Sequence, residues 1–111
     1  MADIADINEA DFEAEVLKSP APVVVDLWAE WCGPCRILGP LLEEIAKEFA
    51  RRGNFGKVNV DQHQALAGRF NVMSIPTLLY FKDGQPVGQT VGALPKNDIL
   101  AKIEDFLKVT L

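Results

Sequence analysis

The sequence has few residues that could form staples or metal sites: 2 cysteines and 1 histidine among 111 residues. A structural zinc site takes four ligands, usually two cysteine pairs or cysteines with histidines, so one chain cannot supply such a site. Hydrophobic residues make up 49% and charged residues 24%, as in an ordinary globular domain. A chain of this length buries an adequate core without cross-links, so we expect a fold that does not depend on the cysteines.

Basic charge is also scarce, because 11 Lys and Arg face 16 Asp and Glu, which gives a formal net charge of -5. Nucleic acids and anionic membrane surfaces both need basic patches, so neither is an expected partner. The first basic residue is Lys18, and no apolar run approaches the length of a membrane span or a secretory signal. We therefore expect a cytoplasmic protein. In that compartment a close pair of cysteines is more often catalytic, redox-sensing or metal-binding than a permanent disulfide.

The pattern of apolar residues predicts an α/β fold. The valine-rich run 23–29 is typical of a strand buried on both faces of a sheet. Apolar residues then recur at helical spacing after Pro34, which suits the first turn of a helix. The other expected elements are helices over 9–18, 63–70 and 92–109, strands over 57–61 and 77–81, and a hairpin strand over 86–91. We expect one domain, residues 1–111, with a mixed sheet and helices on both faces.

Both cysteines lie in the stretch "WCGPC", where the predicted strand 23–29 leads into a helix. A Cys32–Cys35 bridge closes so small a loop that it would add only about 2 kcal/mol of stability. Two incidental buried thiols remain an alternative. The same motif beside a βαβ unit, however, is typical of redox proteins. Residues three apart at a helix start share a face, which keeps their Cα atoms within the roughly 4.4–6.8 Å that a disulfide tolerates.

Position in the helix predicts different roles for the two sulfurs. Cys32 lies at the helix N-terminus, where free N–H groups and the macrodipole lower the pKa of a thiol, so we expect it to be the nucleophile. Cys35 lies one turn further on, and we expect it to be more shielded and to resolve the intermediate. Gly33 leaves room for an incoming disulfide. Pro34 stiffens the turn and removes an N–H that would stabilise the thiolate, which favours a reductant over an oxidant.

The motif, together with "VVVDLWAEWCGPC", "KVNVD", "SIPTLLYFKDG" and "VGALPK", resembles the thioredoxin family over about residues 4–108. The resemblance implies a thioredoxin fold with about five strands in a mixed sheet, no bound cofactor or metal, and a monomer. It also implies a general protein-disulfide reductase and electron carrier. In such a protein Cys32 forms a mixed disulfide with the substrate and Cys35 releases it. A flavin-containing thioredoxin reductase then recharges the pair with electrons from NADPH.

Asp26 is unusual because it interrupts the apolar run 23–29. It is either a buried carboxylate with a raised pKa or a strand-end carboxylate that reaches water. The resemblance implies that Asp26 lies behind the dithiol and assists proton transfer involving Cys35, and that Lys57 lies near it. Taken without the resemblance, Lys57 is an ordinary strand-end lysine.

Four further residues complete the predicted site. The resemblance implies a cis bond between Ile75 and Pro76 in a loop that faces the dithiol, although X–Pro bonds are usually trans. The Ile75 backbone would then pair with an extended substrate segment. Trp31 would supply apolar contact area. Gly92 would let a partner backbone approach, or is a simple turn glycine.

Three other functions fit the same sequence. One is a disulfide donor or isomerase on the same fold, which the Gly-Pro pair argues against. Another is a non-catalytic scaffold. The third is a zinc site shared between two copies of the chain.

Overall fold

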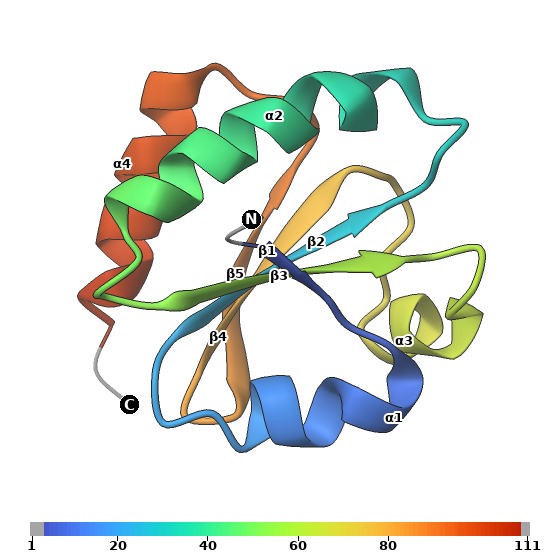
Figure 1. The fold of residues 1–111 in the computed structure, drawn as a ribbon, viewed down its shortest axis with the longest axis horizontal. Coiled ribbons are helices and arrows are strands. Elements are labelled where there is room, and N and C mark those ends of the chain that lie inside the picture. The colour runs from blue at the N-terminus through green and yellow to red at the C-terminus, as the bar shows by residue number, and fades with distance from the viewer. Residues whose placement is uncertain (1–3, 110–111) are drawn as a thin grey trace.

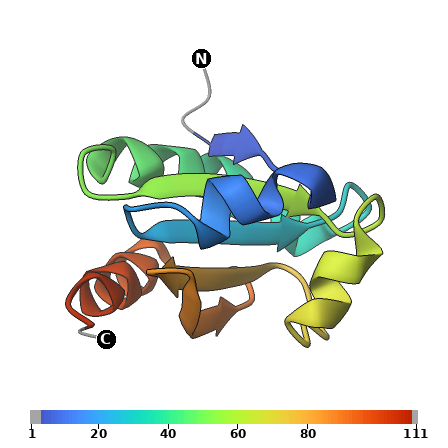
Figure 2. The ribbon, with the colours of Figure 1, turned by 90° about the horizontal axis from the view of Figure 1, so that it is seen from below.

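The computed structural model describes residues 4–109, which form a five-stranded sheet covered by helices on both faces (Figures 1 and 2). The strand order is β1-β3-β2-β4-β5. The elements in chain order are β1 (Ile4–Asp6), α1 (Glu9–Phe12), η1 (Glu13–Leu17), β2 (Val23–Trp28), α2 (Gly33–Glu48), β3 (Asn54–Asn59), α3 (Gln64–Arg69), β4 (Thr77–Lys82), β5 (Gln85–Val91) and α4 (Lys96–Leu107). The predicted α/β class with a mixed sheet is therefore confirmed.

The central strand β2 organises both halves of the core. It pairs in parallel with β3 and antiparallel with β4, so its backbone is hydrogen-bonded on both edges. On one face Val24 packs in the cluster that holds α2 and α4, and on the other Val25 and Leu27 pack in the cluster that holds α1 and α3. Burial on both faces explains why β2 reads as a nearly continuous apolar run.

The structure corrects three of the predicted elements and adds one strand that was not predicted. The helix expected over 9–18 continues from α1 into η1, a π-helical segment in which the Lys18 N–H donates to Glu13 O at 2.8 Å. Strand β3 begins at Asn54, three residues before the predicted start. Strand β1 was not predicted, because three residues are too few to show an alternating pattern. Helix α4 begins at Lys96, after the proline that ends the preceding loop.

A two-residue turn joins β4 to β5. Asp83 and Gly84 have φ angles of 51° and 78°, the combination of a type I′ hairpin turn, for which Asp-Gly is a preferred sequence. A Cβ placed on Gly84 would lie 2.6 Å from Leu17 O, so the turn also packs closely against the end of η1. Only glycine satisfies both the backbone angle and this close approach.

We predict that Gly84→Ala lowers the free energy of unfolding by about 2 kcal/mol or more, because it adds left-handed strain to a clash with backbone. Urea denaturation followed by circular dichroism measures the change. Gly68→Ala is the matched control, since Gly68 lies in α3 and a Cβ there meets nothing within 4 Å. It should raise stability by about 0.5–1 kcal/mol. Equal effects of the two substitutions would contradict the prediction.

Candidate active site

The dithiol lies at the N-terminus of α2, as the sequence predicts. Cys32 is the N-cap residue of this 16-residue helix, and its Sγ accepts a hydrogen bond from Cys35 N at 3.2 Å. Pro34 lies in the first turn, and the position of Gly33 leaves open space where a Cβ would be. The two cysteines form a disulfide with a Cα–Cα distance of 5.2 Å, so the predicted bridge is confirmed.

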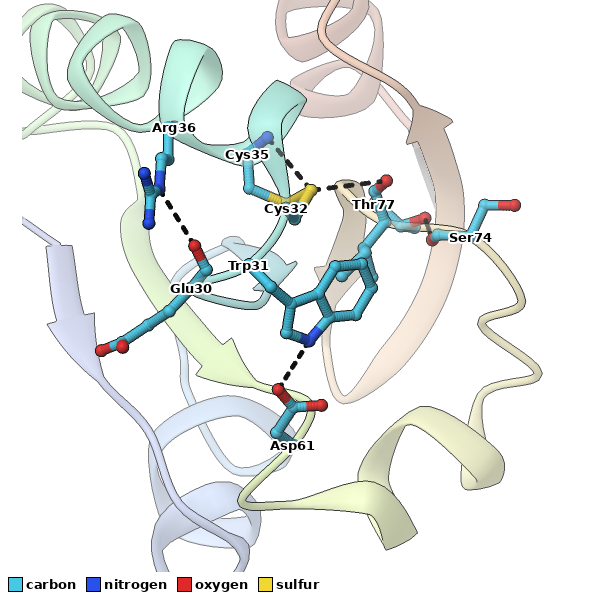
Figure 3. The surroundings of a disulfide bond; sticks show 9 residues. Glu30, Trp31, Cys32, Cys35, Arg36, Asp61, Ser74 and Thr77 are labelled. Carbon is cyan, nitrogen blue, oxygen red and sulfur yellow. Dashed lines mark hydrogen bonds between the residues drawn. A yellow bond between two sulfur atoms is a disulfide. The ribbon is translucent and has the colours of Figure 1, made fainter.

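The expectation that Cys35 is more shielded than Cys32 is wrong, because the residues are 4% and 3% exposed. They differ instead in what surrounds them. Cys32 Sγ lies 3.8 Å from Ile75 O, in the loop before β4 (Figure 3). Cys35 lines a cavity of about 180 Å³ on the inner side of the helix, together with Asp26. Cys32 therefore contacts the loop before β4, whereas Cys35 shares a cavity with the buried carboxyl group of Asp26.

Three of the predicted residues, Ile75, Pro76 and Gly92, lie together in and beside the loop opposite Cys32. The Ile75–Pro76 peptide bond is cis, as the family resemblance implies. Thr77 Oγ1 donates to Ser74 O at 2.6 Å, and Gly92 N donates to Pro76 O at 2.8 Å. Gly92 has a φ angle of 94°, which favours glycine, and a Cβ there would meet nothing within 4 Å. These bonds fix the loop from both sides and leave open space at Gly92.

Trp31 forms the rim of the site on the other side of Cys32. Its side chain is 69% exposed, yet its Nε1 donates to Asp61 Oδ2 at 2.7 Å, which fixes the orientation of the indole (Figure 3). Asn59 Oδ1 in turn accepts from Asp61 N at 2.9 Å and from Gln62 N at 3.3 Å. Sequence reasoning missed Asp61 because nothing local links it to a tryptophan thirty residues earlier in the chain.

A shallow groove of about 410 Å³ extends from Trp31 to the loop before β4. Its lining is mostly apolar and consists of Trp31, Val60, Ala67, Val72, Met73, Ser74 and Ile75. The groove therefore adjoins Cys32 through Ile75.

Asp26 lines a cavity with Cys35 and is buried, with 4% of its surface exposed. The alternative of a strand-end carboxylate that reaches water is therefore wrong. Asp26 Oδ1 has no hydrogen-bond partner among residues 4–109. The cavity that it shares with Cys35 is also lined by Trp28, Arg36, Gly39 and Lys57. Arg36 Nε donates to Glu30 O at 3.0 Å, which ties the first turn of α2 to the residues before it.

The family profile described as Thioredoxin matches residues 3–105 of the chain. The chain belongs to the thioredoxin family.

Several curated thioredoxins are similar to this chain over most of its length. The "Thioredoxin" of Haemophilus influenzae is 50% identical over 99 residues, which cover 89% of this chain and 92% of that protein. The "Thioredoxin 1" of Synechococcus elongatus is 43% identical over 107 residues, covering 96% and 100% of the two chains. The "Thioredoxin M-type, chloroplastic" of Spinacia oleracea is 39% identical over 105 residues, covering 95% of this chain and 58% of that protein.

Thioredoxins are thiol–disulfide oxidoreductases, and the disulfide-bonded Cys32 and Cys35 supply the dithiol that this activity needs. Members of the family act on disulfide substrates, are generally reduced by thioredoxin reductase and need no prosthetic cofactor. Among residues 4–109, no group of three or more His, Cys, Asp or Glu could hold a metal ion. In the same part of the chain, no helix is long and apolar enough to cross a membrane.

The electrostatics of the site centre on Asp26 and its neighbour Lys57. Burial raises the pKa of its carboxyl to about 7, and the positive charge of Lys57 opposes part of that rise. Lys57 is the register partner of Asp26 on β3, and its Nζ lies 3.8 Å from Asp6 Oδ1 and 5.3 Å from the centroid of the Trp28 ring. Lys57 thus lies between the carboxyl groups of Asp6 on β1 and Asp26 on β2 in the sheet.

We predict that Asp26→Asn stabilises the fold and that the gain grows with pH. The folded wild-type protein holds the Asp26 proton up to a pKa of about 7, whereas an unfolded chain releases it near its ordinary value of about 3.9. Wild-type stability therefore falls as pH rises from about 4 to about 7, by on the order of 4 kcal/mol. Asparagine does not titrate, so the variant lacks this loss. Urea denaturation of both proteins at pH 4, 6 and 8 measures the free energy of unfolding. If this energy changed with pH in the same way in both proteins, Asp26 would have to be solvated.

We predict that Lys57→Met raises the pKa of Asp26 further, because burial then acts without an opposing charge. A ¹³C NMR titration of the Asp26 carboxyl measures the shift. Lys96→Met is the matched control, since Lys96 Nζ lies near Glu44 and Glu48 on α2, 3.6 and 3.8 Å from their carboxylate oxygens. An unchanged or lower pKa of Asp26 in Lys57→Met would contradict the assigned interaction.

Proposed function

We propose that this protein is a general protein-disulfide reductase and electron carrier in which Cys32 attacks the substrate and Cys35 releases it. This proposal rests on one observation: the two sulfurs have different surroundings. Cys32 caps α2 and faces the Ile75 loop, whereas Cys35 lines the cavity that holds Asp26.

The first step is attack by the Cys32 thiolate on one sulfur of a substrate disulfide. The substrate S–S bond breaks, a Cys32–substrate disulfide forms, and the other substrate sulfur leaves as a thiolate. The Cys35 N–H, which donates to Cys32 Sγ, and the positive end of the helix dipole stabilise the attacking thiolate. Pro34 contributes no N–H, and this moderates the stabilisation so that the reduced form remains a good electron donor.

The second step is attack by Cys35 on the Sγ of Cys32. Cys35 must first lose its proton, and Asp26 is the base that the shared cavity supplies. A carboxyl group with a pKa of about 7 exchanges protons readily near neutral pH. The mixed disulfide then breaks, the second substrate sulfur leaves, and the Cys32–Cys35 disulfide forms, so two electrons have passed to the substrate. The positive charge of Lys57 lowers the pKa of Asp26.

Substrate binding is assigned to the rim around Cys32. The backbone of Ile75 pairs with an extended substrate segment, and Pro76 keeps a competing side chain away from the sulfurs. Trp31 supplies apolar contact area, while Gly33 and Gly92 leave space for the substrate backbone. Few side chains reach the substrate in this arrangement, which suits a reductase with many different targets.

We further propose that residues 1–111 act as a single monomeric domain in the cytoplasm, in electron transport from NADPH through a flavin-containing thioredoxin reductase. The net charge of -5 supports the absence of nucleic-acid and membrane partners. The family's general use of thioredoxin reductase supports this route of recharging.

We predict that Cys35→Ser stops the reaction after the first step. Cys32 keeps its helix-terminal environment and still attacks, but serine cannot act as the second nucleophile. A stable mixed disulfide should accumulate, and turnover of insulin with dithiothreitol should fall at least about a hundredfold. Capture of lysate proteins by immobilised Cys35→Ser, with elution by dithiothreitol and mass spectrometry, measures the trapped species.

Cys32→Ser is the control for this experiment and should capture nothing that dithiothreitol releases. Capture of the same proteins by both variants would indicate non-covalent binding and favour a scaffold. Capture by Cys32→Ser alone would reverse the roles of the two cysteines. A reduction potential close to those of strong disulfide donors would favour the donor or isomerase function instead.

A further inference from the structure

Met73 is the most exposed large apolar side chain among residues 4–109, with 94% of its surface open to solvent. It lies in the loop between α3 and β4, two residues before Ile75, whose carbonyl oxygen is 3.8 Å from Cys32 Sγ. A single exposed apolar residue is common on protein surfaces and assigns no role. The second observation is that Met73 lines a groove together with Trp31 and Ile75, the neighbours of Cys32.

Met73 forms part of the wall of the groove that extends from Trp31 to Ile75. The other side chains of this groove are mostly aliphatic, so it suits an apolar side chain of a substrate that lies across Ile75. Such a substrate would cover the thioether of Met73 and remove it from water.

We propose that Met73 is an oxidation site, at which conversion of the thioether to a sulfoxide by a peroxide weakens the binding of apolar substrate segments in the groove. The methionine sulfur attacks one oxygen of hydrogen peroxide, the O–O bond breaks, an S–O bond forms, and water leaves. The sulfur is oxidised by two electrons and the peroxide is reduced by two. This inference rests on the proposed function, because the groove matters only if disulfide substrates lie across Ile75.

In the disulfide form, Met73 is more accessible to a peroxide than either cysteine. Both cysteine sulfurs are then bonded to each other, and the residues are only 3% and 4% exposed, so neither offers a thiolate. The thioether of Met73 needs no deprotonation and is open to solvent. The modification is reversible, because methionine sulfoxide reductases restore the thioether.

The sulfoxide at Met73 changes how substrate binds in the groove and leaves the reaction at the cysteines unchanged. Its polar oxygen is well hydrated while Met73 is exposed, but it must lose that water when an apolar side chain covers it. We expect KM for a substrate with apolar flanking residues to rise roughly tenfold, with kcat unchanged. A substrate that does not fill the groove should keep its KM.

The experiment treats the disulfide form with hydrogen peroxide, removes the oxidant and measures turnover with dithiothreitol as reductant. One peptide disulfide carries leucine beside each cysteine, and a second carries glycine. Peptide mapping by mass spectrometry establishes oxidation at Met73 separately from Met1, and a thiol titration establishes that both cysteines survive. Met73→Leu is the matched variant, because leucine is similar in size and cannot be oxidised, and each protein is compared with itself before treatment. Met73→Gln imitates the polar sulfoxide without peroxide.

The proposal is supported if peroxide raises KM for the leucine peptide in the wild-type protein only, and if Met73→Gln has the same selective defect. It is overturned if Met73 resists oxidation, if its sulfoxide leaves KM unchanged, or if peroxide affects Met73→Leu equally. Failure of the untreated wild-type protein to reduce either peptide would overturn the proposed function, and the regulation with it.

Discussion

The short connection between β2 and α2 is the constraint on which the site depends. Strand β2 is hydrogen-bonded on both edges and buried on both faces, so its end cannot shift. Only four residues separate Trp28 from the start of the helix at Gly33, and the Cys32 N–H donates to Ala29 O within that turn. Cys32 is therefore held at the helix N-terminus by the core itself. Asp26, two residues before the end of the same strand, is positioned by the same backbone.

Burying a carboxylate at that point has a cost for the fold. The pKa of Asp26 rises to about 7 because the apolar surroundings disfavour its charge, and Lys57 compensates only in part. The sheet register brings the two residues together, since Asp26 on β2 and Lys57 on β3 are direct partners. The same register places Asp6 of β1 beside Lys57 on its other side.

Much of this arrangement could be predicted from the sequence, because the deciding signals are local. The apolar run before Cys32 and the helical spacing after Pro34 place the dithiol at a strand-to-helix junction without knowledge of the fold. The cis bond at Pro76 could be expected only from the family resemblance, since the local sequence favours trans. The bond from Trp31 to Asp61 joins residues far apart in the chain, and the equal burial of the two cysteines depends on the loop packed over them. Neither this bond nor the burial of the cysteines can be recognised from the local spacing of apolar residues.

The edges of the sheet have a further consequence for how the protein meets other copies of itself. The edge strand β1 has three residues, and the other edge strand, β5, begins with Gln85 and Pro86 opposite an irregular register in β4. Short strands, prolines and bulges at an edge all hinder edge-to-edge association of sheets. The sheet of this protein thus resists edge-to-edge polymerisation, even at high concentration in a crowded solution.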